Sequence, residues 1–491
     1  MKYTLKSLPL SNSFASLPQE FYARVEPSPT LNASRLIHFN PAAAELLGLA
    51  PDCHQTAEFN AIFSGNQPLD NAAHIAMRYA GHQFGQFVPS LGDGRAIMLG
   101  ETTNDRGDRW EIQLKGSGMT PFSRMGDGRA VLRSTIREYL GSEAMFGLGI
   151  ATTRALCITG CDDKVYREQI ETSAILTRLA PSHVRFGSLE YFYYRDKHQP
   201  LKQLLDYVIK HHYPELSDSD NLYLALLSSV IERTAKLIAQ WQSVGFCHGV
   251  MNTDNMSILG LTLDYGPFGF LDGYNPQHIC NHSDHSGRYA YDQQPEIGLW
   301  NLACLAQTLT PFINEEAIKA ELSKYSGRYR HHYQGLMANK LGFETSSTEV
   351  TELLNSLLQQ MQQSQTDFTR LFRRLSDIKS NSQELDAELR DMFVDRDGFD
   401  GWLKNYRTLL IAQGKPDAER QDQMRRTNPK YVLRNYLLQT AIEKAEQQKD
   451  YSEIEKLMQV MQRPFDEWPE FEHYAAQPPK WAGQIAVSCS S

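Results

Sequence analysis

The sequence predicts an α+β protein of two lobes, with a small antiparallel sheet followed by a larger helical part. Two observations predict this fold class. Residues 75–275 are dense in Gly, Arg, Asp and Asn between short apolar runs, whereas amphipathic patterns dominate from about residue 300 onward. Short strands and functional loops produce the first pattern, and helices with one buried face produce the second. At 491 residues, the chain is long enough for two or three domain-sized units.

The sheet is predicted from one alternating segment. Trp110, Ile112 and Leu114 alternate with polar residues, which indicates a strand with one buried face. Lys115 then points away from that apolar face. Residues 96–99 are a second strand candidate, and the turn-rich residues 103–108 between the two segments predict a hairpin.

Helices are predicted after this hairpin. The first has an apolar face with a spacing of four, at Leu132, Ile136, Leu140 and Ala144. Glu138 lies off that face, and Gly147 is expected near the end of the helix. Residues 350–363, 367–375 and 430–447 show the same kind of amphipathic spacing further along the chain.

Composition and charge exclude several classes of protein. The net charge of −9 disfavours a non-specific nucleic-acid binder, so any phosphate binding must be local. No run of 18 apolar residues and no signal-peptide pattern occurs, so we expect a cytoplasmic protein without a membrane partner. The seven scattered cysteines do not form the framework of a small disulfide-rich domain.

A glycine-bracketed turn precedes the predicted hairpin. Gly92 and Gly94 flank it, Arg95 follows, and Lys115 comes 21 residues after Gly94. This is the spacing between the glycine-rich loop and the lysine of protein kinases. Alone it is weak evidence, because a GxG sequence between strands is more often a plain hairpin.

A second segment has the layout of a kinase catalytic loop. In kinases, an H-x-D-x-x-x-x-N loop and a following D-x-G supply a base and two metal ligands. The matching residues here are His248, Asn255, Asp264 and Gly266. The base position holds Val250, which cannot accept a proton, while a carboxylate stands at Asp254. Asn255 and Asp264 offer the oxygen ligands that Mg²⁺ or Mn²⁺ prefers.

Two arginines follow the predicted sheet in an apolar setting. The planar guanidinium groups of Arg178 and Arg185 match phosphate oxygens, although structural carboxylate partners are an equal alternative. Asp127 and Gly128 belong to another tight, polar loop, at residues 126–129.

Taken together, these motifs resemble the selenoprotein O (SelO) family of protein adenylyltransferases, formerly classed as pseudokinases. The resemblance runs through YAGHQFG at 79–85, LKGSGMTPFSR at 114–124, REYLGSEAM at 137–145, the two arginines, the catalytic loop and DYGPFGFLD at 264–272. It implies a two-lobed, protein-kinase-like fold. We divide the chain into an N-terminal extension (1–75), an N-lobe (76–175), a C-lobe (176–300) and a helical C-terminal extension (301–491).

The resemblance also implies an activity. Such enzymes bind ATP inverted relative to kinases and transfer AMP to Ser, Thr or Tyr hydroxyls of proteins, including themselves, with release of pyrophosphate. Asp254 is then the proton acceptor, and Asn255 and Asp264 bind Mg²⁺ or Mn²⁺. The remaining nucleotide-binding positions are Gly92, Gly94, Arg95, Lys115, Asp127, Gly128, Arg178 and Arg185, with Asp264 also on the nucleotide. Glu138 is the expected ion-pair partner of Lys115, with Glu143 less favoured.

Some alternatives stay open at this point. They are transfer of UMP from UTP with Mn²⁺, a kinase that moves the γ-phosphate, and a nucleotide-binding scaffold without turnover. Some family members carry selenocysteine third from the C-terminus, where this chain has Cys489. From placement alone, we hypothesise a reversible disulfide between this terminal thiol and one near the catalytic loop, with Cys280, sixteen residues past Asp264, as the expected partner.

Overall fold

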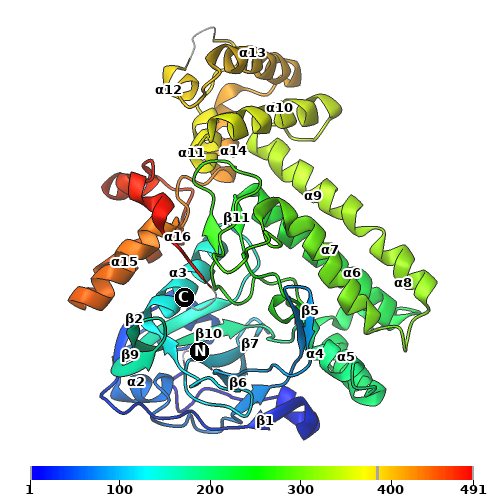
Figure 1. Ribbon diagram of the computed structural model, residues 1–491, viewed down its shortest axis with the longest axis vertical. Helices are drawn as coiled ribbons and strands as arrows, with labels where there is room; N and C mark the ends of the chain where they lie inside the picture. Colours follow the sequence, from blue (N-terminus) through cyan, green and yellow to red (C-terminus); the bar gives the residue numbers. More distant parts are fainter. Residues whose placement is uncertain (1–2, 383–385, 489–491) are drawn as a thin grey trace.

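The computed structural model describes residues 3–382 and 386–488. A sheet-containing N-lobe forms the base of the molecule as drawn in Figure 1, a helical C-lobe lies above it, and a separate group of helices forms the top. The last two α-helices return to the side of the N-lobe. The α+β, two-lobed fold class predicted from the sequence is confirmed.

An antiparallel sheet of eight strands builds the N-lobe. Its strand order is β1-β3-β6-β7-β10-β9-β2, and β8 pairs with β10. The strands are β1 (Tyr22–Arg24), β2 (Arg35–Phe39), β3 (Ile75–Met77), β6 (Ala96–Thr103), β7 (Arg109–Lys115), β8 (Ala130–Val131), β9 (Arg154–Tyr166) and β10 (Ile170–Ala180). The predicted hairpin is the β6–β7 pair, in which Ala96 lies opposite Lys115.

Both faces of β7 are buried, whereas the sequence predicted only one. Ile112 and Leu114 pack under α1 (Pro41–Leu46) and α2 (Ala57–Phe63), as the alternation indicated. Glu111 and Gln113 on the opposite face are buried as well. They are hydrogen-bonded to polar groups of β10 and the loop after it, which makes their burial tolerable.

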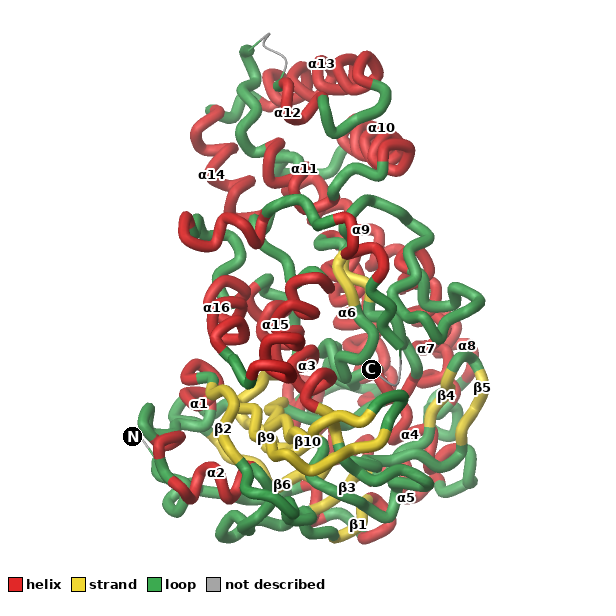
Figure 2. Tube along the Cα trace, turned by 60° about the vertical axis from the view of Figure 1, so that its left-hand side comes forward, coloured by secondary structure: helices red, strands yellow, loops and turns green. Residues whose placement is uncertain are grey.

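Helix α3 (Leu132–Gly147) joins the sheet to the rest of the protein. Its predicted apolar face lies in a core shared with α15 (Asn435–Gln448) and α16 (Ser452–Met461). Figure 2 shows these C-terminal helices beside α3 and the sheet edge that carries β9 and β2. Residues more than 280 positions apart therefore support one helix of the N-lobe.

The C-lobe is built on long helices. They are α4 (Phe186–Tyr193), α5 (His198–His212), α6 (Leu222–Ser243), α7 (Gln294–Gln307), α8 (Glu315–Leu322) and α9 (Tyr325–Lys340). Between them, β11 (Phe246–Cys247) pairs with β12 (Gly269–Phe270), and the predicted catalytic loop with the short 3-10 helix η5 (Thr253–Asn255) connects these two strands. A small hairpin, β4 (Gly81–Gln83) and β5 (Gln86–Val88), packs on α4 and η5.

The top group packs around an apolar core that it shares with neighbouring residues of the C-lobe, such as Leu271 and Met337. It contains α10 (Thr348–Ser364), α11 (Phe368–Leu375), α12 (Ala387–Arg390), α13 (Arg396–Gln413) and α14 (Asp417–Thr427). The three amphipathic segments of the sequence correspond to α10, α11 and α15. In the described parts of the chain, no helix is both long and apolar enough to cross a membrane.

A buried charged residue, Lys340 at the end of α9, contacts this apolar core. The residue is 3% exposed, and its Nζ lies 4.8 Å from the ring centroid of Phe372. None of the ion pairs among the described residues includes it. Burial lowers the pKa of Lys340 to about 7, because a desolvated ammonium is disfavoured.

We expect Lys340→Met to stabilise the protein at pH 7 more than at pH 9.5. The folded pKa lies below the unfolded one, so the unfolded state binds more protons from about pH 7 to pH 10, and folded wild type gains stability as the pH rises through this range. Between pH 7 and pH 9.5, we expect the free energy of unfolding of the wild type to rise by about 1–3 kcal/mol because of this group. The aromatic rings stabilise the ammonium and so keep the rise moderate. Urea unfolding at both pH values measures it, with the exposed Lys319→Met as control. An equal effect of Lys340→Met at both pH values would contradict the prediction.

Candidate active site

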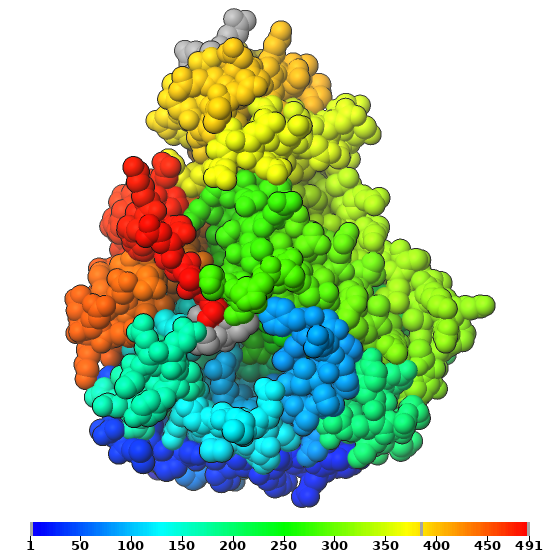
Figure 3. Space-filling model, in the orientation of Figure 1, coloured from blue at the N-terminus to red at the C-terminus, as the bar shows by residue number. Residues whose placement is uncertain are grey.

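A cavity of about 640 Å³ lies between the two lobes. The space-filling view shows a hollow where the N-lobe meets the catalytic-loop region (Figure 3). The structure brings twelve of the predicted residues together in its lining, namely Gly92, Gly94, Arg95, Lys115, Asp127, Gly128, Glu138, Arg178, Arg185, Asp254, Asn255 and Asp264. Residues that lie far apart in the sequence, from Gly92 to Asp264, therefore share one site.

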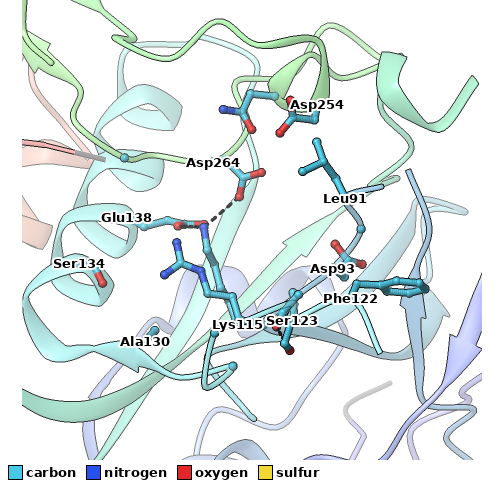
Figure 4. Close-up of a pocket in the computed structure, with 18 of the residues that line it drawn as sticks. Leu91, Asp93, Lys115, Phe122, Ser123, Ala130, Ser134, Glu138, Asp254 and Asp264 are labelled. Carbon is cyan, nitrogen blue, oxygen red and sulfur yellow. Dashed lines mark hydrogen bonds and ion pairs between the residues drawn. The ribbon is translucent and has the colours of Figure 1, made fainter. Parts of the chain in front are cut away.

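Three cations converge on Asp264. Lys115 Nζ lies 2.9 Å from Asp264 Oδ1, Arg178 Nη1 lies 2.5 Å from the same oxygen, and Arg185 Nη1 contacts Oδ2. Glu138 completes the group, at 2.5 Å from Lys115 and 3.0 Å from Arg178. Figure 4 shows Glu138 reaching Lys115 from α3, with Asp264 above them. Asp93 Oδ1 also lies 3.9 Å from Arg185, so three carboxylates face the three cations.

This arrangement fixes the ionisation of Asp264. Burial alone would raise its pKa, but Arg185, Lys115 and Arg178 outweigh burial and hold the pKa well below its usual range. Asp264 also has a left-handed backbone, with φ of 59°. Such conformations in residues other than glycine are uncommon, and they concentrate at functional sites.

Glu143, the less favoured partner of Lys115, lies outside the cavity. Both of its carboxylate oxygens accept hydrogen bonds from Arg154, each at 2.8 Å. Glu143 and Glu138 are five positions apart on α3, so they face different sides of the helix.

The glycine-bracketed turn is clamped from one side. Thr120 Oγ1 donates to the carbonyl of Asp93 at 2.7 Å, and Ser123 Oγ donates to the carbonyl of Gly94. The Asp93 side chain is 2% exposed and accepts bonds from Met77 N–H and Gln113 Nε2, at 3.0 and 3.1 Å. Sequence reasoning missed Asp93, although its place between the two glycines was a signal.

Asp127 is bound to the tip of the β9–β10 hairpin. Its two oxygens accept bonds from Arg167 at 2.9 Å each, and Arg167 lowers the pKa of Asp127. The loop at residues 126–129 is thereby tied to the sheet at the rim of the cavity. Arg167 was not predicted from the sequence.

Asp254 is the most isolated carboxylate of the site. It is 7% exposed and accepts one side-chain bond, from Gln83 Nε2 at 3.0 Å, while its buried Oδ1 has no hydrogen-bond partner among the described residues. Burial raises the pKa of Asp254 to about 6, and Gln83 and Arg185 offset only part of this effect. A Cβ on Gly81 would lie 2.6 Å from Oδ1, so only glycine allows this close approach.

The segment at 79–85 therefore acts on the catalytic loop, a role that the sequence did not reveal. His82 N–H donates to Thr253 Oγ1 at 2.7 Å, and that hydroxyl donates to Glu190 Oε2 at 2.5 Å. His82 Nδ1 lies 2.6 Å from Glu190 Oε1. These bonds position η5, and with it Asp254. The only available signal was the polar, glycine-bounded motif itself.

Asn255 and Asp264 have the chemistry of a site for a hard divalent cation. Asn255 Nδ2 donates to the carbonyl of Val250 at 3.0 Å, which uses the donor of the amide and leaves its oxygen as an acceptor. Asp264 adds a carboxylate that stays ionised. Oxygen donors of this kind fit Mg²⁺ or Mn²⁺.

The predicted redox pair is only half described. Cys280 is buried, its thiol donates to the carbonyl of Cys247 at 3.4 Å, and burial raises its pKa well above the usual range. Cys489 lies outside the described residues. The carbonyl of Val487 accepts a hydrogen bond from His282 N–H at 2.7 Å. Because His282 is two positions after Cys280 in the sequence, the end of the described chain lies beside the Cys280 segment. The disulfide stays a prediction.

Comparison with known proteins agrees with this geometry. Residues 4–462 match the family model of the protein adenylyltransferase SelO. The chain belongs to the SelO family. The resemblance stated from the sequence motifs is thereby confirmed.

Relatives of this SelO family chain match along its whole length. It is 56% identical to the protein nucleotidyltransferase YdiU of Thioalkalivibrio sulfidiphilus, with 100% of both chains covered. It is 53% identical to YdiU of Myxococcus xanthus and 52% identical to YdiU of Thiobacillus denitrificans, with 99% of this chain and 100% of each relative covered. The chain thus belongs to a family of nucleotidyltransferases.

Proposed function

We propose that this protein is a metal-dependent adenylyltransferase that moves AMP from ATP to Ser, Thr or Tyr hydroxyls of proteins, itself included, and releases pyrophosphate. One observation carries the proposal: three buried or nearly buried cations converge in a cavity whose other wall holds the carboxylate of Asp254. Family membership supports nucleotidyl transfer to proteins in general. The residue-level roles below go beyond it.

Lys115, Arg178 and Arg185 would bind the phosphates that leave. Pyrophosphate develops negative charge as its bond to the α-phosphorus breaks, and preorganised cations in a water-poor site stabilise that charge. Arg178 and Arg185 are each 2% exposed, so they lie deep in the cavity. This depth favours an inverted ATP, with its terminal phosphates inside and the α-phosphate nearer the acceptor.

Asp254 would accept the proton of the attacking hydroxyl. Burial raises its pKa to about 6. A general base is most effective when its pKa lies near the operating pH, and this value is close to neutral. Val250 lines the same cavity and has no group that could take this role. The base is therefore moved along the loop relative to kinases.

Asn255 and Asp264 would hold the Mg²⁺ or Mn²⁺ ion. Such an ion would act as a Lewis acid that neutralises part of the phosphate charge. Asp264 would at the same time orient Lys115 and Arg178, because its Oδ1 contacts both.

Intact mass spectrometry after incubation with ATP and Mg²⁺ or Mn²⁺ tests the function. Self-modification is expected to add about 329 Da per site for AMP. Asp264→Ala is expected to abolish the gain, because it removes a metal ligand and the carboxylate that orients Lys115 and Arg178. A gain of about 80 Da would instead indicate a kinase. ATP binding without any gain, either on the protein or on an added mixture of Ser, Thr and Tyr peptides, would favour the scaffold.

UTP is the second donor to test, because the relatives are named nucleotidyltransferases without a stated nucleotide. Incubation with UTP and Mn²⁺ would add about 306 Da per site if UMP is transferred. Comparing initial rates at equal ATP and UTP concentrations decides between the two donors. A cytoplasmic location and independence from nucleic acid remain part of the proposal.

A further inference from the structure

The β4–β5 hairpin forms the wall of the cavity beside Asp254. Gln83, at the end of β4, donates to Asp254 Oδ2, and the next residue, Phe84, also lines the cavity. Gln83 pairs with Gln86, so Phe84 and Gly85 form a two-residue turn. The tip of the hairpin is therefore adjacent in sequence to the residue that contacts the proposed base.

Phe84 is an unfavourable residue for this turn. Its φ is 50° and that of Gly85 is 82°, and two-residue turns with positive φ at both positions strongly prefer Asn-Gly. A bulky residue with positive φ is strained. The aromatic side chain is also 40% exposed. Left-handed residues other than glycine concentrate at functional sites, and this one lines the cavity.

The turn is nevertheless held in place. Phe84 N–H donates to Tyr289 Oη at 2.9 Å, and that hydroxyl donates to Asn252 Oδ1 at 2.6 Å. The Phe84 and Tyr289 ring centroids lie 5.2 Å apart. The guanidinium of Arg288 packs against Gly85. The ring thus packs on Tyr289 and keeps part of its apolar surface exposed.

We propose that Phe84 binds an apolar side chain next to the acceptor hydroxyl of the protein substrate, and so determines which hydroxyls are modified. This inference rests on the proposed function. In the reaction, the acceptor oxygen bonds to the α-phosphorus, the bond from that phosphorus to pyrophosphate breaks, and the hydroxyl proton passes to Asp254. An acceptor placed for this transfer brings its neighbouring residues against the hairpin tip, because Gln83 holds Asp254 and Phe84 follows directly.

Two synthetic peptides test the proposal, each with one central serine, flanked by leucine in the first and by glycine in the second. Wild type is expected to modify the leucine peptide with about tenfold higher kcat/KM, the size of discrimination that an apolar contact provides. In Phe84→Asn this ratio is expected to fall to within about twofold, through loss of rate on the leucine peptide. The melting temperature should stay equal or rise, because Asn suits the turn; unfolding would then not explain the change.

Phe146→Asn is the matched control. Phe146 is also a partly exposed phenylalanine, at 47%, but it lies in the last turn of α3 and does not line the cavity. Its variant should keep the wild-type ratio. An unchanged ratio in Phe84→Asn, or wild type without a preference, would overturn the inference while leaving the proposed function intact. A wild type that transfers nucleotide to neither peptide nor to itself would overturn both.

Discussion

Arg178→Ala is expected to lower the rate of nucleotide transfer by about 10³- to 10⁵-fold, the range for arginines that act on transferring phosphoryl groups. Arg178 bonds to Gln113 at 2.7 Å through Nε, and to Glu138 and Asp264 through Nη1. The substitution therefore removes a cation from the phosphates and also the fixed fork that orients two carboxylates. The rate is measured by transfer of radiolabelled AMP, per mole of folded enzyme.

A stability control is essential, because removing a buried charge partner usually destabilises a protein. Arg154→Ala provides the match. Arg154 is 3% exposed and makes a two-bond ion pair with Glu143 in the same lobe, outside the cavity. It should lower the melting temperature but leave the rate per folded molecule within about tenfold of wild type. An Arg178→Ala rate within tenfold of wild type would remove Arg178 from the proposed site.

The sequence sufficed for features that local patterns encode. The β6–β7 hairpin, the apolar face of α3 and the helices α10, α11 and α15 each follow from a repeat of two or four residues within one segment. The positions that line the cavity were found from short motifs with fixed spacing. Such motifs carry a mechanism, so residues such as Lys115 and Asp264 were recognisable far apart in the chain.

The sequence did not reveal how the site is supported, because support depends on contacts between distant segments. Gln113 read as the solvent side of a strand, yet it is buried between Arg178 and Asp93. Gln83 reaches Asp254 across 171 positions. A polar residue in a period-two pattern looks the same whether water or another lobe covers it. Only the packing of the two lobes decides between these cases.

The same limit applies to the C-terminal extension. Its helix α15 was predicted from amphipathic spacing, whereas α16 was not predicted. Neither segment indicated which part of the protein it covers. In the structure they pack on α3, which carries Glu138 into the cavity. The extension thereby braces α3, the helix whose Glu138 orients Lys115.

The second large effect is expected for Asp254→Asn, which should abolish transfer but stabilise the metal-free protein at pH 7.5. The folded pKa of Asp254, about 6, exceeds that of an unfolded aspartate. The folded state therefore binds more protons than the unfolded state between about pH 4 and pH 6, and its stability falls as the pH rises through this window. Asn carries no charge to bury, so the variant avoids a cost on the order of 1–3 kcal/mol above pH 6.

Asp127→Asn should show the opposite sign, which makes it the matched control. Arg167 lowers the pKa of Asp127, so that its charge contributes stability above the unfolded pKa and the variant should lose some at pH 7.5. Urea unfolding of all three proteins in EDTA, at pH 5 and pH 7.5, measures both effects. If the Asp254 carboxylate serves catalysis at a cost to folding, Asp254→Asn should be inactive and more stable than wild type. An inactive variant that is also less stable at pH 7.5 would mean that the Asp254 carboxylate supports the fold, and its role as a base that is costly to bury would have to be abandoned.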